Sequence, residues 1–256
     1  MTKTNKMTGI SLKSHSLGEF DRIITFFTRE HGLVRAVAKG IKKGNSRWSG
    51  RLDTLFCSQL TLAKGRNLDV ILHADTLYAF PRLRLDLERL THGLYLLELI
   101  LVFSAEDDPH SNDLFDLLIA TLQALEEFTP VSLLILWFEL RLLYQLGYTP
   151  QLEACLYCNL VYDSASPGVR HFDTIGGGYV CTSCSSQARQ PVKLPQLCIE
   201  LWQQLMWRSL GDLVGMSPAA PTVTVAQNVL RNYIVQTAEQ GLKSLTTLKA
   251  IQTAAS

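Results

Sequence analysis

Four cysteines in two close pairs form the pattern with the most definite chemistry. The pairs are Cys155–Cys158 and Cys181–Cys184, and 22 residues separate them. Two residues between the thiols let both sulfurs of a pair face one point, so two such turns supply the four thiolates of a tetrahedral zinc site. A closed site of this kind leaves no coordination position for substrate. The pattern therefore predicts one structural Zn²⁺ per chain and argues against metal catalysis.

Two other uses of these cysteines stay open: redox dithiols, and disulfides of a secreted protein. The residues after Met1 are polar rather than an apolar signal segment, so we expect a reducing, cytoplasmic compartment in which disulfides are rare. A thioredoxin-like dithiol needs a surrounding βαβ pattern, which we do not find. Cys57 and Cys198 have apolar neighbours and are expected to be small buried hydrophobic residues.

A second pattern is a basic stretch of 17 residues without Asp or Glu. Its basic residues are Arg35, Lys39, Lys42, Lys43, Arg47 and Arg51. Trp48 lies among them and offers one aromatic ring for stacking, and Lys64 and Arg66 on a later turn extend the patch. This composition suits a groove for a phosphate backbone, which predicts nucleic-acid binding. The alternative is a solvated basic loop with Trp48 in the core.

The charge is unevenly distributed, although the formal net charge is only +1. Residues 1–80 hold 13 Lys/Arg and 6 Asp/Glu (net +7), whereas residues 81–150 hold 4 and 11 (net −7). This asymmetry suggests domains with different partners. The apolar runs at 94–103 and 131–146 contain charged residues and are shorter than the about 20 residues of a spanning helix, so we expect buried helices and no membrane partner.

Motifs for catalysis are lacking. The sequence contains no GxGxxG, GxxxxGK[ST], HExxH or GxSxG, and its histidines show no ligand spacing among themselves. We therefore expect a protein that is not an enzyme.

The first 80 residues alternate apolar and polar side chains in five short segments separated by glycine turns: 10–13, 22–28, 33–39, 60–63 and 68–73. In the third segment Val34, Ala36 and Ala38 should face one side, with Arg35 and Lys39 on the other. Five short strands with a basic face predict an OB-fold barrel.

Helical periodicity begins after Pro81. One leucine stripe from Leu83 to Leu101 predicts a single helix, and a second helix is expected from Ser111. A third should have Thr129 at its cap and Pro130 in its first turn. The cysteine region follows as an insertion with a small hairpin (170–173 and 179–180). Helix should then resume near Pro195 and pass Leu213, and a last helix should start with a Thr224–Gln227 capping box.

These signals predict an α+β multidomain fold. Residues 1–80 form an OB-fold nucleic-acid-binding β-barrel, and residues 81–256 form an α-helical domain. Residues 151–186 are an inserted, zinc-ribbon-like four-cysteine module.

The chain also resembles the RecO family of bacterial recombination mediators. The resemblance rests on the run from Glu19 to Gly32 (EFDRIITFFTREHG), on Ala38-Lys39-Gly40 with the basic loop after it, and on the closing Gly241–Leu245 (GLKSL). The order of barrel, helices and four-cysteine module agrees with the family over nearly the whole chain.

This resemblance implies a non-enzymatic role in DNA repair, the DNA-damage response and DNA recombination (the RecFOR pathway), near the bacterial nucleoid. RecO-like proteins bind single- and double-stranded DNA, anneal complementary strands, and act with RecR to help RecA replace single-stranded-DNA-binding protein, whose acidic C-terminal tail they contact. Two alternatives remain: an RNA-binding OB/zinc-ribbon protein, and a CxxC thiol-redox protein.

Overall fold

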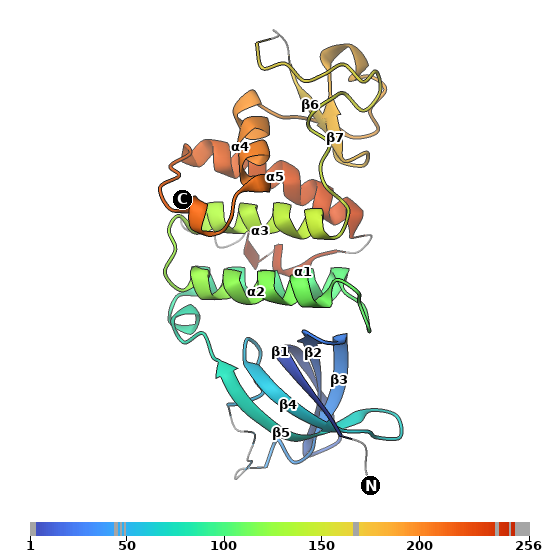
Figure 1. Ribbon diagram of the computed structural model, residues 1–256, viewed down its shortest axis with the longest axis vertical. Coiled ribbons are helices and arrows are strands. Elements are labelled where there is room, and N and C mark those ends of the chain that lie inside the picture. The colour runs from blue at the N-terminus through green and yellow to red at the C-terminus, as the bar shows by residue number, and fades with distance from the viewer. Residues whose placement is uncertain are drawn as a thin grey trace. The chain divides into compact units, whose positions relative to one another are not determined.

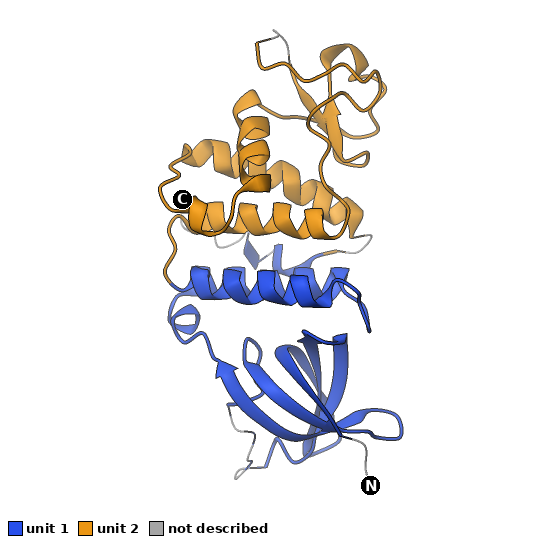
Figure 2. Ribbon diagram, in the orientation of Figure 1, with its two compact units in different colours: residues 1–126, 242–256 blue, residues 127–241 orange. Residues whose placement is uncertain are grey.

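The computed structural model describes residues 4–43, 46, 48, 50–165, 169–238, 241–245, 247 and 248. The chain divides into two compact units, residues 1–126 with 242–256 and residues 127–241 (Figure 2). The two units differ from the expected domains, since residues 81–126 fall in the same compact unit as the barrel. A division by compactness does not test where one domain ends and the next begins. The expected domain boundaries therefore stay a prediction.

The first unit begins with a five-stranded closed barrel (Figure 1). Its strands are β1 (Thr4–Leu17), β2 (Asp21–Thr28), β3 (Gly32–Ala38), β4 (Cys57–Ala63) and β5 (Asp69–Tyr78), in the order β1-β2-β3-β5-β4. All neighbours are antiparallel except β3 and β5, which pair in parallel at Ala36–Asp69 and Val37–Val70. The predicted OB-like barrel is confirmed.

The barrel interior is apolar, and Phe26, Ala36 and Leu60 are fully buried in it. Val34, Ala36 and Ala38 all pack there, as the alternation in β3 predicts. Trp48 belongs to the same core with 3% of its surface exposed, and its indole Nε1 donates a hydrogen bond to the Lys39 carbonyl at 3.0 Å. The stacking role predicted for Trp48 is therefore wrong, and the core alternative holds.

Two α-helices follow the barrel: α1 (Leu87–Phe103) and α2 (Ser111–Leu125), with the 3₁₀ turn η1 (Arg82–Leu85) before them. The predicted single helix from Leu83 to Leu101 is wrong. Asp86 is extended between η1 and α1, where its carboxylate accepts a hydrogen bond from the Arg89 backbone N–H at 3.1 Å and caps α1. The predicted stripe is also partly wrong, because Leu87 and Leu94 of α1 are exposed.

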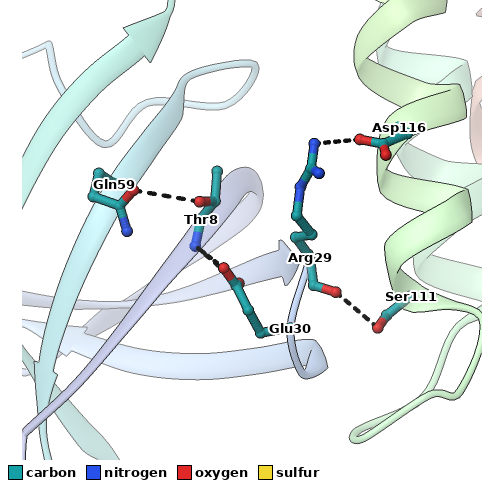
Figure 3. Close-up of polar contacts among 6 residues, drawn as sticks. All are labelled: Thr8, Arg29, Glu30, Gln59, Ser111 and Asp116. Atoms are coloured by element: carbon teal, nitrogen blue, oxygen red, sulfur yellow. Dashed lines mark hydrogen bonds and ion pairs between the residues drawn. The ribbon is translucent and has the colours of Figure 1, made fainter.

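The barrel and α2 are joined by Arg29, which lies just after β2 (Figure 3). Its carbonyl accepts a hydrogen bond from the Ser111 hydroxyl at 2.9 Å, and its guanidinium pairs with Asp116. The guanidinium also lies 5.3 Å from the centroid of the Phe115 ring. At the far end of the chain, the Glu98 carboxylate of α1 accepts the backbone N–H groups of Lys243 and Ser244, which holds this segment in the first unit.

The second unit contains α3 (Val131–Gln145), α4 (Gln196–Trp207) and α5 (Ala220–Thr237), with the 3₁₀ turn η3 (Gly211–Leu213) between the last two. Buried Arg231 donates from Nε to the buried Glu139 carboxylate at 2.9 Å, which links α5 to α3. The cysteine module contributes β6 (His171–Asp173), β7 (Gly178–Val180), η2 (Thr182–Cys184) and β8 (Pro191–Lys193). The predicted hairpin is confirmed as β6–β7, and β8 adds a third strand to it.

Three expected helix boundaries in this unit are wrong. Pro130 is the extended N-cap of α3 rather than a residue of its first turn. Helix α4 ends at Trp207, before the predicted continuation past Leu213. The capping box is absent from the described helix α5, because α5 begins at Ala220 and the Thr224 hydroxyl donates to the Ala220 carbonyl inside it. Among the described residues, no helix is both long and apolar enough to cross a membrane.

Replacing Trp48 by alanine should destabilise the protein. Because the indole is buried in the barrel core, its loss leaves a cavity, and the free energy of unfolding should fall by about 3–5 kcal/mol in urea titrations. Trp207 is 66% exposed, so Trp207→Ala is the matched control and should change stability by less than about 1 kcal/mol. Equal losses in the two variants would contradict the core position of Trp48.

Candidate nucleic-acid interface and metal centre

Three lysines gather where the chain leaves β3, beside the turn between β1 and β2. Lys39, Lys42 and Lys43 are all exposed. The Lys42 backbone N–H donates to the Phe20 carbonyl at 3.0 Å, and its Nζ donates to the Gly18 carbonyl at 3.2 Å. The Lys43 Nζ lies 5.3 Å from the centroid of the Phe20 ring. We call Lys39, Lys42 and Lys43 the lysine cluster.

The lysine cluster forms no ion pair with any of the described residues. Two other basic residues that were predicted to contact DNA do form ion pairs. Arg35 lies 3.6 Å from the Glu106 carboxylate, and Lys64 lies 3.8 Å from the Asp69 carboxylate. A neighbouring carboxylate cancels much of the field that a phosphate would feel. The lysine cluster should therefore attract a phosphate more strongly than Arg35 and Lys64 do.

Arg35 and Lys64 both line a pocket of about 300 Å³ at the side of the barrel. Its other lining residues include Leu33 of β3 and Asn67, but also the acidic Glu106 and Asp107. His31 lies here too, with its Nδ1 3.3 Å from the Asp107 carboxylate. Because the lining mixes both signs of charge, this pocket is a poor continuation of a phosphate groove.

Three predicted basic contacts remain: Arg47, Arg51 and Arg66. Arg51 and Arg66 are exposed, and neither has an ion pair among the residues described. Arg47 lies outside the described residues. The role of the predicted set in binding DNA stays a prediction.

Sequence reasoning missed Phe20 as part of this surface. Its side chain is 45% exposed, although it belongs to a strongly apolar residue type. One feature of the sequence could have indicated its exposure. Phe20 follows Gly18 in the turn between β1 and β2, and side chains of a turn do not point into the barrel core. The basic stretch alone could not indicate it, because Phe20 precedes Lys39 by 19 residues.

The four cysteines of the second unit come together as predicted. Their sulfur atoms all lie within 4.8 Å of one another, and the Cys158 and Cys181 sulfurs are 3.7 Å apart. Zn–S bonds of about 2.3 Å in a tetrahedron require sulfurs about 3.8 Å apart. A disulfide would need about 2.05 Å. The cluster is therefore compatible with a structural metal and contains free thiols rather than disulfides.

Tight local turns aim these sulfurs. Asn159 adopts a positive φ of 57° and donates its N–H to the Cys155 carbonyl at 3.0 Å, which closes the first turn. Burial raises the pKa of the Cys155 thiol, but backbone N–H groups, first that of Cys181, lower it to about 6. Burial and the neighbouring thiols raise the pKa of Cys184 to about 12. Burial also raises the pKa of Cys181, so the site favours the thiolate of Cys155 and would need a cation to deprotonate Cys181 and Cys184.

Asp173 is a structural residue that the sequence did not reveal. Its carboxylate is buried and accepts hydrogen bonds from the Tyr157 hydroxyl at 2.8 Å and from the N–H groups of Ile175, Arg189 and Gln190. Burial raises its pKa, but these donors outweigh burial and hold the pKa below its usual value. Asp173 thereby ties the first cysteine turn to the chain beyond the second.

Comparison with known proteins covers both halves of the chain. The family model for the N terminus of Recombination protein O matches residues 1–80, and the model for its C terminus matches residues 84–246. The chain belongs to the RecO family. Among relatives named DNA repair protein RecO, that of Nocardioides sp. is 36% identical over 92% of this chain and 95% of its own length. The corresponding protein of Pelotomaculum thermopropionicum is 32% identical over 94% and 92%.

The RecO family membership agrees with the resemblance in the sequence. The N-terminal RecO model covers the barrel and the lysine cluster, and the C-terminal RecO model covers α1 to α5 and the four cysteines.

Thiol titration should separate a metal site from a redox site in this RecO protein. Burial raises the pKa of Cys57 to about 12 and of Cys198 to about 11, so neither should react at pH 7.5 in the folded protein. The four clustered thiols should react slowly until a chelator removes the metal. We expect four additional reactive thiols with chelator and six after denaturation. Rapid reaction of the cluster without chelator would contradict a metal-filled site.

Proposed function

We propose that this RecO protein acts in DNA repair and recombination as a mediator rather than as an enzyme. In this proposal it binds single- and double-stranded DNA, anneals complementary strands, and acts with RecR to help RecA replace single-stranded-DNA-binding protein. The supporting observation is the exposed lysine cluster, which has no acidic partner in the part of the chain that the structure describes, on an OB-like barrel of a RecO chain.

The proposed role follows from the physics of backbone contacts. Phosphate contacts carry no sequence information, so a lysine cluster can hold any strand. Two complementary strands repel each other, and neutralising phosphates on one of them lowers this repulsion. The cost of bringing the strands together falls accordingly, which is what annealing requires.

A cationic and aromatic surface of the second unit supports the proposed binding of an acidic tail. The Arg141 guanidinium lies 5.4 Å from the centroid of the Tyr144 ring, and Trp207 packs edge-on against Tyr144 at 5.5 Å. Trp207 remains 66% exposed. A peptide that ends in acidic and apolar residues could place its apolar side chains on Trp207 and a carboxylate near Arg141.

The metal of the four-cysteine cluster is proposed to be one structural Zn²⁺ per chain. Four thiolate ligands in a closed site favour zinc over metals that prefer oxygen ligands. Cys155, Cys158, Cys181 and Cys184 would hold it, and its charge would stabilise their thiolates. Elemental analysis of protein purified without added metal tests the identity of the ion.

Removing the lysine cluster should weaken DNA binding for every sequence alike. If about four phosphates of a single strand are contacted, the logarithm of affinity should fall with the logarithm of salt at a slope of about −3. Lys39→Ala, Lys42→Ala and Lys43→Ala combined should flatten this slope by about 2 and slow strand annealing. Filter binding over several salt concentrations, with RNA as a competitor, measures the effect.

The matched control removes the same charge from the second unit. Arg189, Lys193 and Arg208 are exposed, and their combined change to alanine should leave the slope as it is. An unchanged slope in the lysine variant would show that DNA binds elsewhere. Much tighter binding to RNA than to DNA would instead favour an RNA-binding protein.

Trp207→Ala should weaken binding of a peptide with the acidic C-terminal sequence of single-stranded-DNA-binding protein. A central exposed aromatic anchor typically contributes at least about 2 kcal/mol, so titration calorimetry should show an affinity loss of about 30-fold or more. Tyr148→Ala removes another exposed aromatic of the same unit and should have little effect. Equal binding by Trp207→Ala and the unaltered protein would exclude this surface.

A further inference from the structure

An exposed aromatic ring stands beside the lysine cluster. Phe20 lies at the turn between β1 and β2, and 45% of its surface is exposed. It is not a member of the barrel core, which holds Phe26 and Trp48 instead. The position of a large exposed aromatic next to three lysines that form no ion pair with any described residue calls for an explanation other than packing.

The turn that carries Phe20 is held in place by the segment that carries the lysines. The Phe20 carbonyl accepts the Lys42 N–H at 3.0 Å, and the Gly18 carbonyl accepts from the Lys42 Nζ at 3.2 Å. On the other side of Phe20, the Asp21 carboxylate accepts the Gly40 N–H at 2.7 Å. Ring and lysines therefore form one preorganised surface, which lowers the entropy lost when a ligand binds.

We propose that Phe20 is the base-stacking residue of this surface and gives it a preference for single strands over duplex. This inference rests on the proposed DNA binding. The lysine cluster would hold the phosphates while an unpaired base stacks on the ring, and any base can do so because every base has a π face. Bases inside a duplex are stacked on their neighbours, so Phe20 cannot reach them without distorting the helix.

The ring already attracts a cation, which fits this use. The Lys43 Nζ lies 5.3 Å from the ring centroid, within the range of cation–π attraction. A strand that stacks a base on Phe20 brings its phosphate close to the same ammonium group. Phe20 would thus bind the base of a nucleotide while Lys43 binds its phosphate. The exposed carboxylate of Glu19 is the one unfavourable neighbour in this turn.

The test compares Phe20→Leu with the unaltered protein on an unstructured single strand and on a duplex of equal length. Leucine keeps an apolar side chain but has no aromatic face. Single-strand affinity should fall about 5- to 100-fold, whereas duplex affinity should stay within about twofold. The salt slope should stay the same in both cases, because no charge is removed. Phe20→Tyr should restore single-strand binding.

The control is Tyr78→Leu, which removes another exposed aromatic of the first unit and should change neither affinity. A direct readout uses Phe20→Trp combined with Trp207→Phe, because the other tryptophans are at most 5% exposed. Single strands should quench the fluorescence of this new indole and duplex should not.

The outcomes separate the two proposals. If the unaltered protein binds no DNA, the proposed function fails. If it binds DNA and Phe20→Leu binds single strands equally well, the stacking role is wrong and the proposed function stands. An equal loss for single strand and duplex, with unchanged thermal stability, would also overturn the stacking role.

Discussion

Closure of the barrel around an apolar interior is the constraint on which the position of the lysine cluster depends. Strands β3 and β5 close the barrel through only two paired positions, so interior packing must supply much of the stability of this seam. The Trp48 indole packs inside, and its N–H bonds to the Lys39 carbonyl. One side chain therefore fills the core and fixes the point where the lysine cluster begins. The position of the three lysines on the surface is therefore a consequence of packing in the core.

A chain with a net charge of only +1 can still form a strongly positive site, because charges act over a Debye length of about 8–10 Å. Several acidic groups of the first unit are engaged within the fold rather than left free. The Asp21 carboxylate accepts a hydrogen bond from the Gly40 N–H. The Glu30 carboxylate accepts one from the Thr8 N–H, and the Asp116 carboxylate pairs with Arg29 (Figure 3). Of these carboxylates, that of Asp21 lies next to the lysine cluster and is held by the Gly40 N–H, whereas the exposed Glu19 carboxylate of the same turn opposes the positive field.

Patterns confined to a few residues could be predicted from the sequence, and contacts between distant residues could not. Alternation along β3 gave the interior side chains, and the spacing of two CxxC pairs gave a four-sulfur cluster. Nothing near Arg35 in the basic stretch indicates that Glu106, 71 residues later in the chain, will lie beside it. Trp48 and Phe20 show the same limit, since only the fold decides which aromatic is buried and which is exposed.

The predicted helix boundaries were wrong for a related reason. Helix α1 is apolar on most of its circumference, so leucine spacing alone cannot select its buried face: Leu96 and Leu99 are buried while Leu87 and Leu94 are exposed. The break before α1 depends on one polar side chain, Asp86, whose carboxylate caps the helix. A leucine stripe continues through such a break without any change in period.

Two sets of contacts hold the cysteine module, and they determine which part of it a bound metal would stabilise. Phe172 of β6 is fully buried and packs edge-on against Trp202 of α4 at 5.2 Å and against Tyr233 of α5 at 5.7 Å. This aromatic contact anchors the base of the module to the helices without any metal. The cysteine turns are instead tied to each other: Tyr162 and Tyr179, which flank them, pack edge-on at 5.3 Å, and Asp173 connects them through hydrogen bonds. A metal ion bound to the four cysteines would therefore stabilise mainly the turns themselves, and its removal should loosen them while α3, α4 and α5 stay packed.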